Sequence, residues 1–203
     1  MNYFVTAIGT DCGKTVVSAI LCRALQADYW KPVQAGLPTD ADQVKSLVDL
    51  KRSVIHPETY RLKTPASPHA AAFIEGKHIQ LDHFGLPDHK GDLIIEGAGG
   101  CLVPLNDTEF VIDLASKFNT QVILVSNFYL GSINHTLLTF EALKARKLSV
   151  RGIIFNGPAN EESQRIILKV TGLKCLLQIH QEPVIDGDVI AKYATKLLDH
   201  WND

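Results

Sequence analysis

The sequence predicts an α/β fold in which helices cover both faces of a mostly parallel sheet. Several short runs are apolar throughout, as strands that are buried on both faces are. Segments with helical spacing of apolar residues lie between or after these runs. The chain contains no internal repeat, no low-complexity tract and no linker, so we expect residues 1–203 to form a single domain.

The first half of the chain begins with a clear strand and helix. The run "NYFVTAI" (2–8) is apolar and β-branched and predicts a buried strand, and residues 14–27 have the spacing of an amphipathic helix. "YWKPV" (29–33) predicts a second short strand. Residues 39–50 predict a helix that starts at Thr39, a good N-cap residue followed by acids.

The rest of the chain alternates between the two kinds of element. Residues 51–91 have the least regular pattern, and within them "SPHAAAFIEG" (67–76) predicts a short helix. Apolar runs predict strands at 92–97, 121–126, 150–156 and 174–179. Helical spacing predicts helices at 109–118, 132–147, 162–172 and 188–201.

Composition excludes several classes of function. The chain has 203 residues and 46% hydrophobic content, which is enough for a sizeable core. Its formal net charge is −2 and it has no run of Lys and Arg, so we expect neither nucleic acid nor an anionic membrane as a partner. The start of the chain lacks the basic region of a signal peptide, and no apolar run is long enough to cross a membrane.

The cysteine pattern is typical of a protein in a reducing compartment. Cys12, Cys22, Cys101 and Cys175 are scattered without the CxxC spacing of a metal or redox site. We therefore expect reduced thiols in a cytoplasmic protein.

One loop carries the strongest chemical signal. In "VTAIGTDCGKTVVS", residues 13–15 are the Gly-Lys-Thr that ends a phosphate-binding P-loop, but Ile8 stands where the standard motif has its first glycine. The turn could instead use Gly9, or a longer loop that starts at Ala7. The loop lies between a predicted strand and a predicted helix, which is the context that a P-loop requires.

Other strand ends carry polar side chains at the same edge of the predicted sheet. Glu96 follows the apolar run "DLII" and could complete a magnesium–phosphate site, or it could face solvent. Lys31 could serve the site or be an ordinary surface lysine. Asn156 could read a nucleobase edge or close a turn. In parallel sheets ligands bind at the carboxyl ends of strands, so the combination predicts a nucleotide site.

Together these segments resemble the dethiobiotin synthetase family, the ATP-dependent ring-closing enzymes of biotin synthesis. The resemblance rests on "FVTAIGTDCGKT", "KPVQAG", "TPASPHAAAF", "IIEGAGGCLVPL", "LGSINHTLLTFEAL" and "GIIFNG", in the family's order. They cover most of residues 3–157, whereas the last fifty residues carry little signature. The resemblance implies a P-loop NTPase-type three-layer fold.

The sequence departs from the family pattern at three places. The family loop is Gly-Thr-Asp-Thr-x-x-Gly-Lys-Thr, and its first three residues fall on Ala7, Ile8 and Gly9, whereas Thr10 matches. Ala35 stands where the family usually has a Ser or Thr that contacts substrate. The segment 77–91 is shorter than the corresponding segment of relatives, which contains a longer helix.

The resemblance implies a reaction between ATP, CO₂ (from bicarbonate) and 7,8-diaminopelargonate. One amine takes up CO₂ as a carbamate, whose oxygen attacks the γ-phosphate. The second amine then closes the ureido ring and expels phosphate. Carbamate and triphosphate repel each other, so cationic groups must bring them together.

The resemblance also implies roles for individual residues. The catalytic groups would be Lys14 on the phosphates, Lys31 on the carbamate, and Thr10 as its hydrogen-bond donor. Mg²⁺ would be held by Thr15, Glu96 and an acid, for which Asp40 fits the family's pattern better and Asp42 is the second choice. The nucleotide would be bound by Asp11, Cys12, Gly13, Lys14, Thr15, Val16 and Asn156. The substrate would be bound by Lys31, Ala35, Gly99, Gly131, Ser132 and Asn134.

In the family the "LGSINH" loop reaches the site of a partner subunit, which implies a homodimer. Backbone N–H groups of Gly131 and Ser132, at a helix start, would suit the substrate carboxylate. Two other functions stay open. One is a P-loop switch ATPase of the partitioning or septum-site class, although "AIGTD" lacks the early lysine that class requires. The other is a related amide-forming ligase of cofactor synthesis.

Overall fold

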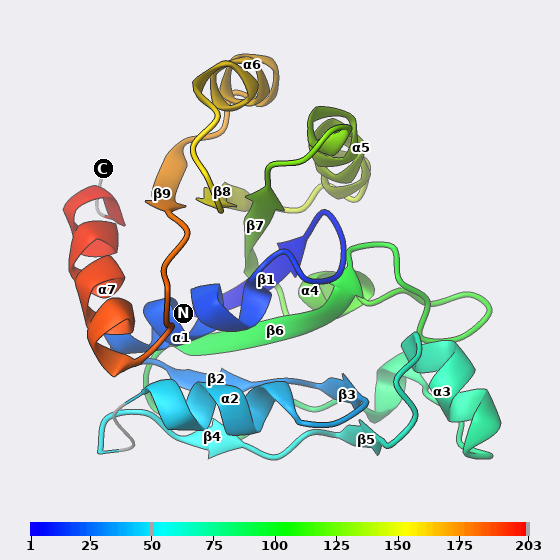
Figure 1. Ribbon diagram of the computed structural model, residues 1–203. Coiled ribbons are helices and arrows are strands. Elements are labelled where there is room, and N and C mark those ends of the chain that lie inside the picture. The colour runs from blue at the N-terminus through cyan, green and yellow to red at the C-terminus, as the bar shows by residue number, and fades with distance from the viewer. Residues whose placement is uncertain (49–50, 202–203) are drawn as a thin grey trace.

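A central sheet of seven parallel strands forms the middle layer of the molecule (Figure 1). The computed structural model describes residues 1–48 and 51–201. The strand order is β4-β2-β6-β1-β7-β8-β9, so the N-terminal strand lies at the centre. The strands are β1 (Asn2–Ala7), β2 (Asp28–Trp30), β4 (Ile55–His56), β6 (Leu93–Gly100), β7 (Gln121–Asn127), β8 (Val150–Asn156) and β9 (Cys175–Ile179).

Helices cover both faces of this sheet, as the sequence predicts. On one face, α1 packs against α2 and α7, and these three share a core with inward residues such as Val5 and Tyr29. On the other face, α4, α5 and α6 cover residues such as Phe4 and Phe155. The helices are α1 (Lys14–Leu25), α2 (Asp40–Leu47), α3 (Pro68–Ile74), α4 (Asp113–Lys117), α5 (Ser132–Ala145), α6 (Glu161–Thr171) and α7 (Gly187–Trp201).

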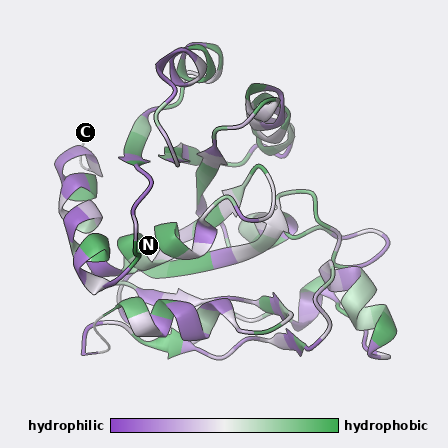
Figure 2. Ribbon diagram, in the orientation of Figure 1, coloured by the Kyte–Doolittle hydropathy of each residue, from purple (hydrophilic) through white to green (hydrophobic). Residues whose placement is uncertain are grey.

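The central strands are buried on both sides, which explains their continuous apolar sequences. Figure 2 shows hydrophobic colouring over much of β6 and alternating hydrophobic and hydrophilic bands along α7. Among the residues that the structure describes, no helix is long and apolar enough to cross a membrane.

Several predicted elements differ in length. The predicted strand 29–33 is two strands, because β2 ends at Trp30 and β3 (Val33–Ala35) leaves the main sheet to pair with β5 (Tyr60–Leu62). The predicted strand 92–97 continues to Gly100 as β6. The predicted helix 39–50 ends at Leu47, and residues 49–50 lie outside the described residues.

Two predictions missed local structure in the less regular segments. The sequence pattern did not reveal the short strands β4 and β5 or the 3₁₀ turn η1 (Leu81–His83). The predicted helix 109–118 is shortened to α4 because its first residues fold back on the preceding segment. There, Leu105 N donates to Glu109 O and Val111 N donates to Val103 O, which form a tight turn in place of a first helical turn.

Candidate active site

The P-loop connects β1 to α1 without a glycine in its first turn. Ala7 is the last residue of β1, and Ile8 N donates to Val125 O, so the loop starts only after the strand's own hydrogen bonds end. Left-handed backbone occurs at Asp11 (φ 56°) and Gly13 (φ 92°). Because Asp tolerates this conformation better than most residues, the loop turns at Asp11 and Gly13. Its backbone does not require the glycine that the standard motif places at position 8.

Asn156 lies against this loop from the end of β8. Its Nδ2 donates to the Cys12 carbonyl over 3.0 Å. A Cβ at Gly13 would lie 2.2 Å from the same Nδ2, so glycine is required here by contact as well as by φ. The amide of Asn156 therefore fastens the loop to the neighbouring part of the sheet.

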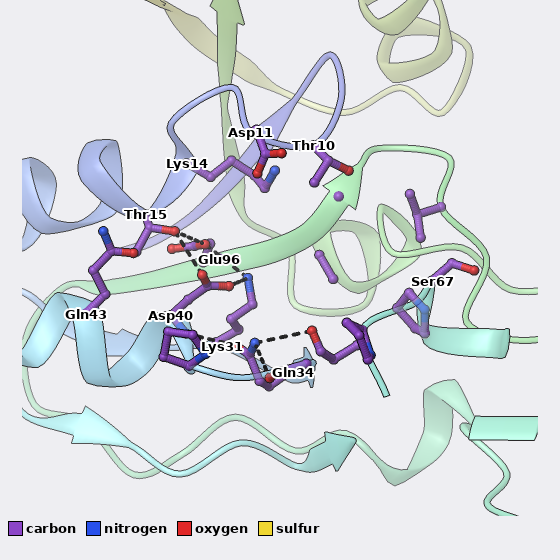
Figure 3. Close-up of a pocket in the computed structure, with 18 of the residues that line it drawn as sticks. Thr10, Asp11, Lys14, Thr15, Lys31, Gln34, Asp40, Gln43, Ser67 and Glu96 are labelled. Carbon is purple, nitrogen blue, oxygen red and sulfur yellow. Dashed lines mark hydrogen bonds and ion pairs between the residues drawn. The ribbon is translucent and has the colours of Figure 1, made fainter. Parts of the chain in front are cut away.

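Four side chains, from α1, α2, β6 and the residue after β2, meet beside the P-loop, and we call Thr15, Lys31, Asp40 and Glu96 the cation–carboxylate cluster (Figure 3). Lys31 Nζ lies 3.0 Å from Glu96 Oε1 and 2.5 Å from Asp40 Oδ2. Thr15 Oγ1 lies 3.1 Å from Glu96 Oε1 and 3.3 Å from Asp40 Oδ1. Lys31 and Glu96 are buried, with 4% and 1% of their side chains exposed, so neither is a surface charge.

Register in the sheet explains why these groups meet. Trp30 pairs with Ile95 in the β2–β6 ladder, so Lys31 and Glu96 come next on the two strands. Both then point to the face covered by α1, where Thr15 lies in the first turn. The sequence prediction that Lys31 and Glu96 share one edge is correct, although Glu96 lies within β6 and not at its end.

Burial and neighbouring charges shift the pKa values of the two lysines at the site. Burial lowers the pKa of Lys14, and the positive charge of Lys31 lowers it further. Burial alone would also lower the pKa of Lys31, but Glu96 and Asp40 outweigh it and leave this pKa raised. Lys31 is therefore held as an ammonium between two carboxylates, whereas Lys14 Nζ donates to the Gly9 carbonyl over 3.1 Å.

Tyr29 completes the surroundings of Glu96. Its hydroxyl donates to Glu96 Oε2 over 3.0 Å, and its side chain is fully buried. Burial and then the charge of Glu96 raise the pKa of Tyr29 well above its ordinary value, so the hydroxyl stays a neutral donor. Glu96 thus uses one oxygen toward Tyr29 and the other toward Thr15 and Lys31.

The cluster forms the floor of a cavity of about 740 Å³. The P-loop borders one side, and Ala98, Gly99 and Val103 border another. The opposite side, which we call the outer wall, consists of residues 34–38 and 65–68. Such a volume lies within the usual range for sites that bind small molecules.

Two side chains hold the outer wall in place. Gln34 Oε1 accepts from Asp40 N over 3.1 Å while its Nε2 donates to Gly36 O over 3.2 Å. Glu75, just after α3, accepts from the backbone N–H groups of Lys63 and Thr64 over 2.6 and 2.9 Å. These bonds lower the pKa of Glu75 to about 2, with the Thr64 backbone as the largest cause. The wall is thus fixed by hydrogen bonds to its backbone.

Most of the predicted site residues lie around this one cavity, and the rest lie elsewhere. Thr10, Asp11, Gly13, Lys14, Thr15, Val16, Lys31, Ala35, Asp40, Glu96 and Gly99 line it. The cavity lining does not include Cys12, Asn156, Gly131, Ser132 or Asn134. Asp42, the second choice for the metal, instead accepts from Thr39 Oγ1 over 2.6 Å and lines a separate, smaller hollow.

One expectation about the start of α5 is wrong. Ser132 is buried and its N–H donates to the Tyr129 carbonyl over 2.9 Å, so this N–H is not free for a carboxylate. Asn134 and Gly131 are exposed at the surface. All four cysteines are free thiols, as predicted, and burial raises the pKa of Cys12, which argues against a reactive thiolate.

Sequence reasoning missed several residues of the site. Gln34 and Tyr29 lie in or next to the quoted motif "KPVQAG", but their contacts depend on α2 and β6, which are distant in sequence. Residues 65–68 belong to the quoted motif "TPASPHAAAF", yet nothing in their pattern indicates that they face the P-loop across a cavity.

The fold and this site define a P-loop NTPase-type protein. A ParA family ATPase from Chlorobium tepidum TLS is similar over 98% of this chain and 96% of its own, with a TM-score of 0.58 and 14% identity. The septum site-determining protein MinD of Pyrococcus horikoshii OT3, complexed with Mg-ADP, has a TM-score of 0.55, with 16% identity over 100% of this chain and 97% of its own. At such identities the likeness concerns the fold alone.

Sequence relatives identify the family. A family described as "AAA domain" matches residues 1–188. The chain is 62% identical to the ATP-dependent dethiobiotin synthetase BioD of Cytophaga hutchinsonii, over 98% of each chain. It is 50% identical to the protein of that name from Christiangramia forsetii, over 96% of this chain and 95% of the relative. The chain belongs to the ATP-dependent dethiobiotin synthetase family, whose members are ligases of biotin biosynthesis.

Proposed function

We propose that the protein closes the ureido ring of dethiobiotin from 7,8-diaminopelargonate, CO₂ and ATP. One substrate amine adds to CO₂ and loses a proton, giving a carbamate. A carbamate oxygen attacks the γ-phosphorus, the bond to ADP breaks, and a carbamic–phosphoric anhydride forms. The second amine attacks the carbonyl carbon, and phosphate leaves as the ring closes. The whole reaction fits one α/β domain, residues 1–203, acting in the cytoplasm.

The observation that carries the proposal is that Lys14 and Lys31 line the same cavity from different strand ends. The carbamate and the triphosphate are both anions, so their approach costs free energy unless cations lie between them. Lys14 follows the P-loop turn and would contact the β- and γ-phosphates. Lys31, on the cavity floor, would contact the carbamate and the phosphoryl group that it receives.

The cavity also contains a ligand set that fits Mg²⁺. Asp40 Oδ1 and Glu96 Oε1 lie 3.3 and 3.1 Å from Thr15 Oγ1, so three possible oxygen ligands for a metal lie around one point. Mg²⁺ prefers one or two carboxylates together with substrate phosphates. When bound, Mg²⁺ would neutralise charge on the ATP phosphates.

The remaining contacts follow from the shape of the cavity. Thr10 lies at its rim, where its hydroxyl could donate to the carbamate. Asp11, Cys12, Gly13 and Val16 would hold the phosphates and ribose through the loop and the first turn of α1, with Asn156 beside them. Gly99, with φ 66°, and Ala35 would face the substrate.

We further propose a homodimer in which the start of α5 completes the partner's site. Leu130 is fully exposed, and Tyr129 and Leu138 are 45% and 60% exposed, which leaves an apolar surface at this end of α5. Gly131 and Asn134 lie on the same surface and away from the cavity of their own chain. Burial of this surface against a second copy would bring these residues to the substrate of the other subunit.

The decisive experiment measures ADP and phosphate released by the purified protein with MgATP, bicarbonate and diaminopelargonate. Release should require all three, and dethiobiotin should form in equal amount by mass spectrometry. Omitting diaminopelargonate is the matched control. ADP release that is independent of the diamine would instead favour a switch ATPase, and nucleotide use only with another acid and amine would favour a related amide-forming ligase.

A further inference from the structure

Outside the predicted set, Tyr29 is a buried residue whose side chain hydrogen-bonds directly to a side chain of the cation–carboxylate cluster. Tyr29 OH donates to Glu96 Oε2 over 3.0 Å, while Glu96 Oε1 accepts from Thr15 Oγ1 over 3.1 Å and from Lys31 Nζ over 3.0 Å. The two oxygens of one carboxylate are therefore assigned to different partners. The inner oxygen faces the core and the outer oxygen faces the cavity.

This assignment matters because a glutamate carboxylate turns easily about its last bond. That torsion has broad, roughly two-fold preferences, so packing alone does not fix the plane in which the two equivalent oxygens lie. A donor on one oxygen fixes the plane of the group. Residues that orient a metal ligand in this way commonly change metal affinity by about 10–100-fold when they are removed.

Tyr29 is itself held firmly. It lies in β2, between β4 and β6, with its N–H donating to Val54 O over 2.9 Å. Its ring belongs to the buried core under α1 and α7. Tyr29 pairs with Ile94 in the β2–β6 ladder, two residues before Glu96, so its ring reaches along the same face of the sheet.

We infer that Tyr29 is a positioning residue that orients the Glu96 carboxylate for metal binding by hydrogen-bonding its inner oxygen. The inference rests on the proposed function, in which Glu96 is a ligand of Mg²⁺. Tyr29 touches neither nucleotide nor substrate in this scheme. It acts only through Glu96.

The test compares Tyr29→Phe with a matched control, Tyr193→Phe. Tyr193 is also a fully buried tyrosine whose hydroxyl donates to a glutamate, Glu182, over 2.6 Å, but it lies in α7 away from the cavity. Mn²⁺ is the probe, and its binding to the full chain with ADP is followed by electron paramagnetic resonance. ADP binding in EDTA, the thermal unfolding midpoint and the Mg²⁺ dependence of turnover are measured in parallel.

We expect Tyr29→Phe to weaken Mn²⁺ binding about tenfold or more and to raise the Mg²⁺ concentration for half-maximal turnover. ADP affinity in EDTA and kcat at saturating Mg²⁺ should change by less than about twofold. Tyr193→Phe should lower the unfolding midpoint and leave Mn²⁺ affinity unchanged. If Tyr29→Phe does not fold, Tyr29→Met, which fills similar space without a donor, replaces it.

Two results would overturn the inference. Equal Mn²⁺ affinity in Tyr29→Phe and wild type would do so, as would equal losses in both tyrosine variants, which would indicate a general effect on stability. Glu96→Gln separates this failure from that of the proposed function. If Glu96→Gln binds Mn²⁺ as tightly as wild type, the metal assignment itself is wrong and Tyr29 has no ligand to orient. If only Glu96→Gln weakens binding, the assignment stands without Tyr29.

Discussion

The floor and the outer wall of the cavity are built in different ways. The floor consists of side chains from β6, the residue after β2 and the starts of α1 and α2, and its Lys31 and Glu96 are almost fully buried. The outer wall consists of loops, residues 34–38 and 65–68, whose backbone is held by single side chains. Neighbouring strands fix the position of the floor, whereas a few hydrogen bonds fix the wall.

We therefore expect the floor and the wall to have different roles. Chemistry at the phosphates requires groups held within a fraction of an ångström, and central strands supply that rigidity. In the proposed function the wall would bind the diamine, and a wall made of loops tolerates variation. Changes in the floor should therefore abolish the reaction, and changes in the wall should mainly alter substrate affinity.

The largest effect should come from Lys14→Ala. Loss of this cation removes charge stabilisation that is needed at the transferring phosphoryl group, so kcat/KM should fall by about 10³-fold or more. Among the residues that the structure describes, the hydrogen bond of its ammonium is to one loop carbonyl, that of Gly9, so the unfolding midpoint should change little. Lys169→Ala, on the exposed side of α6, is the control. Turnover that survives unchanged in Lys14→Ala would refute the assignment of the phosphate site.

Lys31→Met should damage both activity and stability, which would distinguish the buried floor from the P-loop. The change leaves Glu96 buried beside Asp40 without its cation, and breaking a buried pair costs about 3–5 kcal/mol, less here because Asp40 is partly exposed. We expect about 2–4 kcal/mol by urea unfolding. Lys31→Arg should restore most of the stability. An unchanged midpoint would mean that the cluster contributes nothing to folding.

The floor could be predicted from sequence and the wall could not. Lys31 and Glu96 follow or lie in strands with plain apolar patterns, and parallel pairing brings such positions to one edge. The end of β6 was not predicted, because the glycines after Glu96 resemble a turn although β6 continues through them. By contrast, residues 65–68 reach the cavity through Glu75, whose role depends on bonds to a backbone eleven and twelve residues away.

Contacts between segments that are distant in sequence also explain the other errors of the sequence prediction. The N–H of Ser132 looked free because helix starts usually offer such groups, but the loop before α5 turns back and Tyr129 O accepts from it. Tyr29 reads as an ordinary strand residue, since nothing local indicates which carboxylate its hydroxyl meets. Hydrophobic period identifies strands and helices, whereas a single hydrogen bond between distant segments leaves no pattern.

Glu75→Gln should produce an intermediate effect confined to the wall. The folded pKa of Glu75, about 2, lies below the ordinary value near 4.5, so its carboxylate stabilises the fold above the ordinary value and loses that contribution as pH falls through about 2. The variant should therefore unfold at a lower temperature than wild type at pH 7. The two midpoints should converge toward pH 2.

The same variant should raise the KM for diaminopelargonate several-fold with little change in kcat, because it loosens the segment before α3. Glu162→Gln, which removes a surface pair with Arg165 on α6, is the control and should leave both constants unchanged. A fall in kcat as large as that of a floor variant would erase the distinction between the two regions.

Ala35→Ser should have the smallest effect and tests the wall most finely. Ala35 lines the cavity and is partly exposed, so a hydroxyl can be added there without displacing the buried core. A hydroxyl here could form a new hydrogen bond to substrate, which would be worth about 0.5–1.5 kcal/mol at most. We therefore expect the KM for diaminopelargonate to stay equal or fall up to about tenfold at constant kcat. A large loss of activity would show that the added hydroxyl disrupts the surface through which the wall holds the substrate. The wall would then tolerate as little change as the floor.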